Sequence, residues 1–416
     1  MRAEKPRNEL ESRVSWSGLE ELVRRSAQSL LQHALEQEVT EFLGRERSER
    51  RDAVDTTTGY RNGYGKPRRL TMSCGTIELR RPRLRDLEDK FESRLLPLFV
   101  KRTEKVNELL PELYLHGLSL GDFDVALRGL LGDDAALSSG TVARLKDVWQ
   151  VEFEEWRRRS LKGVEVVYLW VDGVYVKAGL EKDKAALLVA IAGLADGRKE
   201  IVALRPGQRE SASAWSDLLR DLRDRGMNAP SVVIGDGHLG IWAALTNVYP
   251  TSREQRCWNH RMVNVLDKIS KKYQQQGKTL LREIPYAESE SKAEQAKRRF
   301  QQWCKDHDFD EASKLIDKDW HRMIAFYGFP KDHWTHLRTT NVIESPFAAL
   351  RLRTDAAKRF KKVTNATAVI FKCLLVAQKN FRGLNGQQFL KDVFHGVAFK
   401  DGERVQVAKS KKKVSA

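Results

Sequence analysis

The sequence predicts an α/β protein with a mixed central sheet, interrupted by an all-α insertion and preceded by a mainly helical region. Four short runs rich in Val, Ile and Leu are typical of strands: 164–177, 185–194, 200–204 and 231–235. Two helical patterns follow, at 211–225 and from about 239 to 248, and Gly226 ends the first of them. Strands that alternate with helices in this way indicate a sheet built around at least one crossover connection.

The order of these elements predicts the topology of the sheet. The first three strands are expected to be antiparallel, because Asp196-Gly197 is a hairpin turn signal. The first is expected to run unbroken through Asp172, with its turn at 179–183. The helix at 211–225 then crosses over, so that the fourth strand lies beside the first, about 4.8 Å away. This arrangement favours an RNase H-like mixed five-stranded sheet.

The first third of the chain is predicted to be mainly helical. Apolar residues recur at helical spacing over 18–43, and 103–159 is expected to form three helices. The last two fit a helix-turn-helix, although an ordinary helical bundle gives the same apolar stripe. Between these regions, 66–73 and 76–81 are expected to pair as a β-hairpin, and the glycines of 58–65 indicate turns.

The chain of 416 residues is strongly basic, with 74 Lys and Arg against 57 Asp and Glu and a net charge of +17. Such a field attracts polyanions, of which nucleic acid is the commonest large one. Four cysteines are too few for a disulfide framework, and 1–20 lacks the apolar segment of a signal peptide. The longest apolar run, 185–195, is too short to cross a bilayer. We therefore expect a cytoplasmic protein that binds nucleic acid and no membrane.

Three acidic residues, Asp172, Asp236 and Glu344, stand near the ends of different elements. Carboxylates gathered at one point of a basic protein are typical of a divalent metal held against a phosphate backbone. Each also has a simpler interpretation: Asp172-Gly173 as a hairpin turn, Asp236 as a helix cap, and 341–344 as a capping box. Because the first and fourth strands are expected to be neighbours, Asp172 and Asp236 are expected to lie close together.

Several motifs occur in one consistent order, and together they resemble the bacterial Mutator-type (MULE-related) insertion-sequence transposases, a DDE-class family. The resemblance covers roughly 18–379. The matching runs are VDGVYVK at 171–177, GQRES at 207–211 with Trp215, IGDGH at 234–238, QRCWNH at 255–260 and RTTNVIES at 338–345, with TGYRNG at 58–63 and ELRRP at 78–82. Several such motifs in register are far more specific than any one alone.

The resemblance implies that Asp172, Asp236 and Glu344 are the catalytic triad and bind two Mg²⁺ (or Mn²⁺) ions. It implies a transposase that binds the terminal inverted repeats of its element in double-stranded DNA, as a homodimer, cleaves a strand and transfers the 3′-OH to target DNA. An inactive relative that binds DNA without cutting is the alternative. The intact triad favours the active enzyme.

Three further residues, His238, Cys257 and His260, are expected to support the active site. A second Cys-x-x-His pair, Cys304 and His307, leaves a Cys2His2 zinc site open. Phosphates are expected to meet basic side chains, with a solvated charged face as the alternative. The candidates are Arg68, Arg69, Arg80, Arg144, Lys146, Arg338, Arg351, Arg353, Arg359 and Lys361.

The 108 positions between Asp236 and Glu344 (344 minus 236) are too many for a direct return to the sheet, and their helical spacing predicts an all-α insertion. Its Trp320, Tyr327 and Trp334 fit core packing better than stacking on an unpaired base. If Asn341 caps the following helix, Pro346 falls inside it and implies a shifted start or a kink. The predicted segments are a helical N-terminus (1–55), a β-hairpin region (56–100), a helical DNA-binding segment (101–160), the core (161–262 and 336–380), the insertion (263–335) and a basic tail (381–416).

Overall fold

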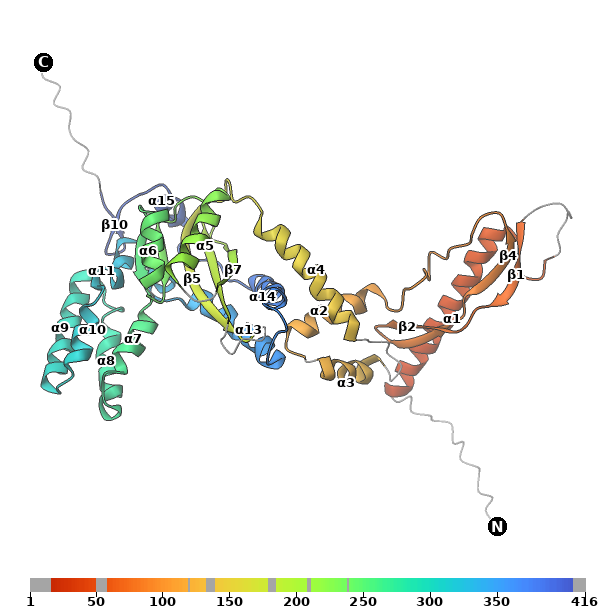
Figure 1. Cartoon of the computed structure of the whole chain (residues 1–416), viewed down its shortest axis with the longest axis horizontal. Helices are drawn as coiled ribbons and strands as arrows, with labels where there is room; N and C mark the ends of the chain where they lie inside the picture. Colours follow the sequence, from red (N-terminus) through yellow and green to blue (C-terminus); the bar gives the residue numbers. More distant parts are fainter. Residues whose placement is uncertain are drawn as a thin grey trace, which may run out of the picture. The chain divides into compact units, whose positions relative to one another are not determined.

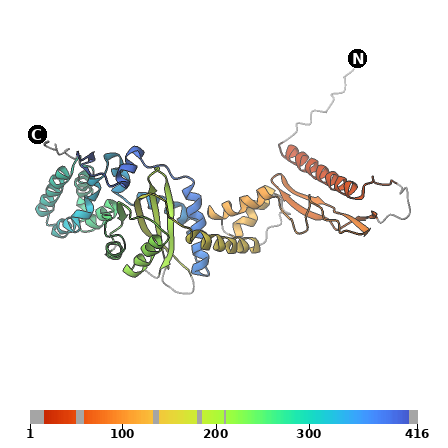
Figure 2. The same ribbon diagram turned by 90° about the horizontal axis from the view of Figure 1, so that it is seen from above.

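The computed structural model describes residues 16–49, 58–118, 120–131, 139–178, 185–207, 211–237 and 239–406. The chain forms two compact units (Figures 1 and 2). The first comprises Met1–Tyr114 and Leu118–Arg144, and the second comprises Leu115–Gly117 and Leu145–Ala416. Each unit is described by itself below.

The first unit combines a long helix with two antiparallel strand pairs. Its elements are α1 (Trp16–Leu43), β1 (Thr58–Tyr64), β2 (Arg68–Met72), β3 (Gly75–Leu79), β4 (Pro82–Leu87), α2 (Glu104–Leu115), α3 (Leu120–Leu131) and the start of α4 (Ser139–Arg157). Its core contains Leu35 of α1 together with Ile77 and Leu79 of β3. The apolar positions in the first half of α1 are exposed, with Leu22 at 58% and Leu30 at 70%, so only the second half of the helix packs as its spacing predicts.

The predicted hairpin is confirmed, because β2 and β3 pair antiparallel up to Met72 and Gly75, across a tight turn. The prediction of turns over 58–65 is wrong, since β1 pairs with β4 from Thr58 to Tyr64. The register of that pair shifts between Arg61 and Tyr64, and a bulge of this kind absorbs a turn-like pair of residues within a strand.

The second unit is built on a five-stranded sheet in the order β7-β6-β5-β8-β9 (Figure 1). The strands are β5 (Val166–Val176), β6 (Ala185–Leu194), β7 (Lys199–Gly207), β8 (Val232–Gly235) and β9 (Arg253–Arg256). The first three are antiparallel, and β8 runs parallel to both β5 and β9. The predicted order of the first four strands is therefore confirmed, whereas β9 was not located from the sequence.

The strand pairing shows whether Asp172 lies in a strand or in a turn. Asp172 lies within β5 and pairs with Val189 of β6, so its interpretation as a hairpin turn is wrong. The predicted turn at 179–183 lies outside the described residues, but Val176 and Ala185, which flank it, are paired. Between β6 and β7, Gly197 has φ +87 and the expected tight turn is present.

Helices cover both sides of this sheet (Figures 1 and 2). The helices α5 (Ala212–Asp224) and α6 (Leu239–Val248) share a core with Leu169, Val171 and Val233. On the other side lie α13 (Asn341–Ala357) and α14 (Val363–Gln378). Because side chains alternate along a strand, Tyr168 and Trp170 face away from α5, and they bond to His333 and the carbonyl of His336.

Every regular element between β9 and α13 is helical. The α-helices are α7 (Trp258–Leu266), α8 (Gln274–Glu283), α9 (Glu290–Asp306), α10 (Asp310–Asp317), α11 (Trp320–Met323) and α12 (Trp334–Leu337), with 3-10 turns between some of them. Tyr327 and Trp334 are buried, which agrees with core packing, and Trp320 packs edge-on against Trp258. After α14 come α15 (Leu390–Phe394) and the short strands β10 (Phe399–Lys400) and β11 (Glu403–Arg404). No helix among the described residues is long and apolar enough to cross a membrane.

Candidate functional site

Asp172 and Asp236 lie at the same level of two neighbouring parallel strands. Trp170 of β5 pairs with Ile234 of β8. Asp172 comes two residues after Trp170, and Asp236 comes two residues after Ile234. Adjacent strands are about 4.8 Å apart, so the two backbones approach closely at this level. Asp172 alternates with the core residue Val171, and its side chain therefore points to the face away from α5 and α6. Both acids are half-buried.

Glu344 enters from the first turn of α13, which packs against β5. The capping-box interpretation of 341–344 is wrong, because the N-cap residue is Thr340 and Asn341 is already helical. The carboxylate of Glu344 accepts a hydrogen bond from the hydroxyl of Thr340. Pro346 lies inside α13, which continues to Ala357 in spite of it. Glu344 is thus held by a side chain of its own helix terminus.

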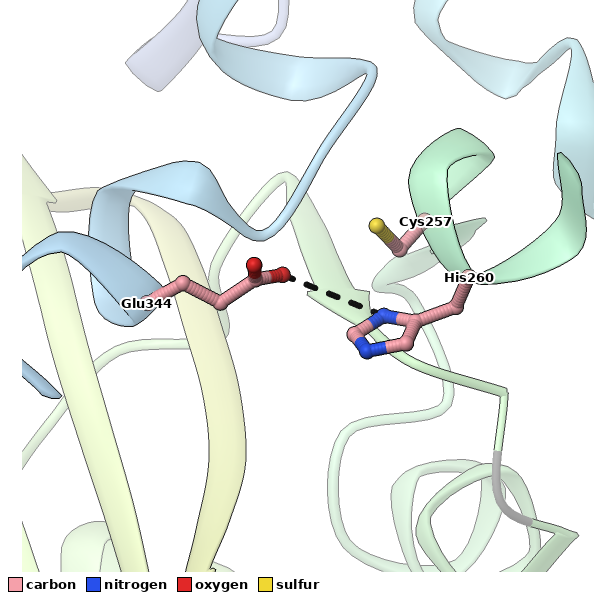
Figure 3. A group of neighbouring side chains, drawn as sticks. All are labelled: Cys257, His260 and Glu344. Carbon is pink, nitrogen blue, oxygen red and sulfur yellow. Dashed lines mark ion pairs between the residues drawn. The ribbon is translucent and has the colours of Figure 1, made fainter. Parts of the chain in front are cut away.

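Cys257, His260 and Glu344 form a compact cluster (Figure 3). Each offers one potential ligand atom, and these atoms all lie within 4.8 Å of one another. His260 Nδ1 is 3.9 Å from Glu344 Oε1. The sulfur of Cys257 lies 3.3 Å from the backbone N–H of Thr340, which donates to it, and 3.2 Å from the Thr340 hydroxyl. One buried threonine therefore contacts two members of the cluster.

The cluster is fastened to the strand that carries Asp236. The backbone N–H of Cys257 donates to the carbonyl of Gly235, at the end of β8, over 2.8 Å. The neighbouring Trp258 N–H donates to the carbonyl of Arg338, just before α13. The start of α7 thus bridges the chain segments that carry Asp236 and Glu344.

The surroundings of His260 favour positive charge. A hydrogen bond to Cys257, and the negative charges near the ring from Cys257, Glu344 and Asp236, raise the pKa of His260 to about 9 against the lowering effect of burial. A pKa above 7 means that the imidazole is protonated at neutral pH. Asp236 and Glu344 therefore act on one shared cation, which brings two of the three predicted acids into the same electrostatic site.

Two further predictions concern His238 and the possible zinc ligands Cys304 and His307. His238 lies outside the described residues. The pair Cys304 and His307 is apart from the cluster: His307 Nδ1 bonds to the backbone carbonyl of Trp303, and its ring stacks on Phe309. Burial raises the pKa of the Cys304 thiol to about 12. Across the ranges that the structure covers, potential metal ligands group without these two residues, so a Cys2His2 site is not formed.

The basic candidates separate into exposed and packed residues. Arg69, Arg80, Arg144, Arg351, Arg359 and Lys361 are exposed, while Arg68 and Lys146 are half-buried. Arg353, another predicted DNA contact, is 3% exposed and lies on the inner side of α13. Arg338 is engaged inside the protein, where it donates to the carbonyl of Pro285 and stacks over Tyr286 at 4.2 Å.

A basic cavity of about 1090 Å³ lies in the first unit. Arg68 and Arg69, two of the predicted DNA contacts, line it together with five further cations: Lys66, Arg81, Arg83, Lys90 and Lys101. Phe99 also lines it, is 91% exposed and has the unusual φ of +75. Sequence reasoning missed Phe99, for which the only signal was an apolar run at 95–100 within a charged region.

An α/β core with acidic residues on two neighbouring strands, next in sequence to a unit with a basic cavity, is typical of an enzyme that acts on a polyanion. Comparison with known proteins agrees. The family model "Transposase, Mutator family" matches residues 3–382. The chain is 42% identical over 305 residues to the transposase for insertion sequence element IS6120 of Mycolicibacterium smegmatis, covering 72% of this chain and 93% of that relative.

More distant relatives carry the same description. The chain is 38% identical over 279 residues to the transposase for element IST2 of Acidithiobacillus ferrooxidans, covering 67% of this chain and 94% of that protein. It is 24% identical over 370 residues to the transposase for IS256 in transposon Tn4001 of Staphylococcus aureus, covering 88% and 93%. The chain belongs to the Mutator family of transposases.

Proposed function

We propose that this transposase is a DDE enzyme with an RNase H-like core, in which Asp172, Asp236 and Glu344 are the catalytic triad. The observation that carries the proposal is the alignment of the first two acids. Trp170 and Ile234 pair on adjacent parallel strands, and Asp172 and Asp236 each follow one of them by two residues. Glu344 enters from a helix that packs against the first of these strands. The three acids thus come from elements remote in sequence, and we infer that their carboxylates meet beside β5.

The donor set fits Mg²⁺ or Mn²⁺. Hard divalent ions prefer carboxylate oxygens, and the three acids are each half-buried, which leaves them reachable from solvent. Two bound ions would supply activation of the attacking hydroxyl and stabilisation of the leaving oxygen. The chain's own contribution is to hold the acids in register and to keep protonated His260 beside Glu344, where its charge attracts a DNA phosphate.

The basic cavity of the first unit is proposed to bind the terminal inverted repeats. Its seven cations neutralise phosphates, and such contacts give sequence-independent affinity that falls steeply with salt. Phe99 offers an exposed ring beside them, suited to stacking on a base or sugar. The reaction proposed is hydrolysis that frees a 3′-OH, followed by transfer of that end to target DNA, within a homodimer on the DNA.

The chain supplies its own control for the triad, because the second unit also contains an Asp-Gly pair that lies away from the proposed site, in a turn of the same sheet. Asp172-Gly173 and Asp236-Gly237 belong to the proposed site, whereas Asp196 lies in the β6–β7 turn and pairs with Arg198 at 2.7 Å. Each aspartate is replaced by asparagine, and cleavage and joining of element-end DNA are measured with Mg²⁺. We expect Asp172→Asn and Asp236→Asn to bind DNA but to lose joining by roughly a thousandfold or more.

Asp196→Asn is expected to join DNA at the wild-type rate, because its carboxylate serves only the turn. Wild-type joining by Asp172→Asn or Asp236→Asn removes that residue from the mechanism. Joining by the wild type that persists in a chelator counts against metal dependence as a whole.

A further inference from the structure

We propose that Cys257, His260 and Glu344 form a second kind of metal site, one for a thiophilic divalent cation of the Zn²⁺ class, and that its occupation withdraws Glu344 from the acidic triad. The site is defined by the cluster in Figure 3. The inhibitory part of this inference rests on the proposed function, whereas the binding part does not.

The ligand types separate this site from one for Mg²⁺. Thiolate, imidazole and carboxylate are the three ligand classes that Zn²⁺ uses, and sites with three protein ligands keep a fourth position open. A sulfur ligand is soft and is seldom chosen by Mg²⁺. The triad offers only oxygen, but the cluster around Glu344 offers sulfur, nitrogen and oxygen. The two sites therefore select different ions and share one residue.

The spacing of the ligand atoms is close to that of a bound ion. With Zn–N and Zn–O distances near 2.0–2.2 Å, tetrahedral ligands stand roughly 3.3–3.6 Å apart. His260 Nδ1 and Glu344 Oε1 are 3.9 Å apart, and Cys257 Sγ lies within 4.8 Å of both. Closure needs a movement of roughly half an ångström to one ångström at each atom. Glu344 is a long side chain, so this movement is available through its own torsions.

The contacts of the Cys257 sulfur suit a metal ligand. The backbone N–H of Thr340 donates to the sulfur over 3.3 Å, and backbone donors of this kind support metal-bound thiolates. Cys257 is also the N-cap of α7, where the helix dipole favours negative charge. On binding, the Cys257 thiol and the His260 imidazolium each release one proton to solvent, and the freed lone pairs on sulfur and Nδ1 form the bonds to the metal.

The position of His260 is a second, independent sign of a metal site. Its Nδ1 is buried and lies 3.9 Å from Glu344 Oε1, too far for a hydrogen bond to that carboxylate. The same atom points toward Glu344 and the sulfur of Cys257 in Figure 3. A ring nitrogen that is closed off from solvent and turned toward a thiol and a carboxylate is in the position of a metal ligand.

The second Cys-x-x-His pair of the chain provides the matched control. Cys304 and His307 have the same spacing in sequence but no carboxylate completes a group with them among the described residues. Full-length protein is titrated with Co²⁺, and thiolate-to-cobalt charge-transfer absorption is recorded. We expect one equivalent of Co²⁺ to produce this absorption, and equimolar Zn²⁺ to abolish it. Cys257→Ser should lose it, and Cys304→Ser should keep it.

Two further variants keep the test independent of folding and of activity. His260→Ala alters a more exposed residue than Cys257 and should weaken Co²⁺ binding at least tenfold while the circular dichroism spectrum is unchanged. Asp172→Asn should retain the absorption, because Asp172 belongs to the triad alone. Absence of the absorption in the wild type, or its survival in Cys257→Ser, overturns the site.

The inhibitory consequence is tested separately. Micromolar Zn²⁺ is expected to slow Mg²⁺-dependent joining by the wild type at least tenfold and to have no such effect on His260→Ala measured against its own rate. Zinc binding without inhibition overturns the sharing of Glu344 and leaves the binding site standing. Full joining by Asp172→Asn, with the cobalt absorption intact, instead contradicts the proposed function alone.

Discussion

The hydroxyl of Thr340 donates a hydrogen bond to the carboxylate of Glu344. Thr340 is fully buried, so it cannot contact DNA, and its backbone N–H donates a hydrogen bond to the sulfur of Cys257. A hydrogen bond to a charged group stabilises its geometry by about 1.5–3 kcal/mol. The orientation of one proposed catalytic acid thus depends on a residue that takes no direct part in the chemistry.

This contact predicts a difference between two substitutions of nearly equal size. Thr340→Val removes the hydroxyl and keeps the shape, whereas Thr340→Ser keeps the hydroxyl. Loss of about 1.4 kcal/mol of positioning corresponds to a tenfold lower rate. We expect Thr340→Val to join DNA about tenfold more slowly and to need more Mg²⁺ for half-maximal rate, and Thr340→Ser to approach the wild type. Equal Mg²⁺ dependence in the two variants would falsify a positioning role.

Binding of Mg²⁺ at the triad should also raise the thermal stability of the protein. A ligand that binds only the folded state at 100 times its Kd adds about 2.7 kcal/mol to the free energy of unfolding. We therefore expect Mg²⁺ to raise the melting temperature of the wild type and of Asp196→Asn, and to have little effect on Asp236→Asn. Differential scanning calorimetry with and without Mg²⁺ measures this. A rise of the same size in all three proteins contradicts binding at the triad.

The sheet was predictable because its patterns are local. Runs such as 185–194 are apolar throughout, and the crossover rule then restricts where β8 can lie. By contrast, β9 is only Arg253–Arg256, four residues of which three are charged, and it forms a strand because β8 offers an open edge. No propensity in those four residues indicates a strand.

The sequence order locates Asp172 and Asp236 on neighbouring strands, but it does not show that Glu344 packs beside Cys257 and His260. Asp172 and Asp236 follow from strand register, which sequence order fixes once the crossover is known. The meeting of Cys257 with Glu344 depends on how the helical region between them folds back, and this rests on tertiary contacts remote in sequence. The same holds for Arg353, whose charge suggested DNA although the helix turns it inward.

The basic cavity predicts a change in salt dependence. Arg83 is exposed and lines the cavity, and each phosphate neutralised contributes about 0.9 to the slope of log K against log salt. Arg83→Ala should lower the magnitude of that slope by about 1 on any DNA sequence. Arg298, an exposed residue of α9, is the control for loss of one positive charge. The hypothesis fails if both substitutions change the slope alike in a fluorescence anisotropy titration.

At Phe99, the effect of the ring on DNA binding can be separated from the effect of backbone strain on stability. Its φ of +75 is unfavourable for any residue with a side chain, so Phe99→Gly removes the ring and relieves strain. Stacking on a base is worth about 1–3 kcal/mol, and we expect binding of element-end DNA to weaken at least fivefold. Thermal stability should not fall. Unchanged affinity in Phe99→Gly would assign the exposed ring no part in DNA binding.

His336 should make the stability of the second unit depend on pH. Burial, and then the charge of Lys199, lower the pKa of His336 from 6.5 to about 4, and its Nε2 accepts a hydrogen bond from the backbone N–H of Asn385. The unfolded chain binds the proton more readily than the folded chain. Stability from the neutral ring is therefore complete above about pH 6.5 and is lost as the pH falls toward 4.

His336→Gln keeps a hydrogen-bond acceptor at this position and removes the titration, so it should flatten the loss of stability between these two pH values. His321, which is exposed in the same unit, is the control, and His321→Gln should leave the profile unchanged. Urea unfolding followed by tryptophan fluorescence measures the effect, since the indole N–H of Trp170 donates to the carbonyl of His336 itself. A profile that is as steep in His336→Gln as in the wild type would show that protonation of this ring does not limit the acid stability of the core.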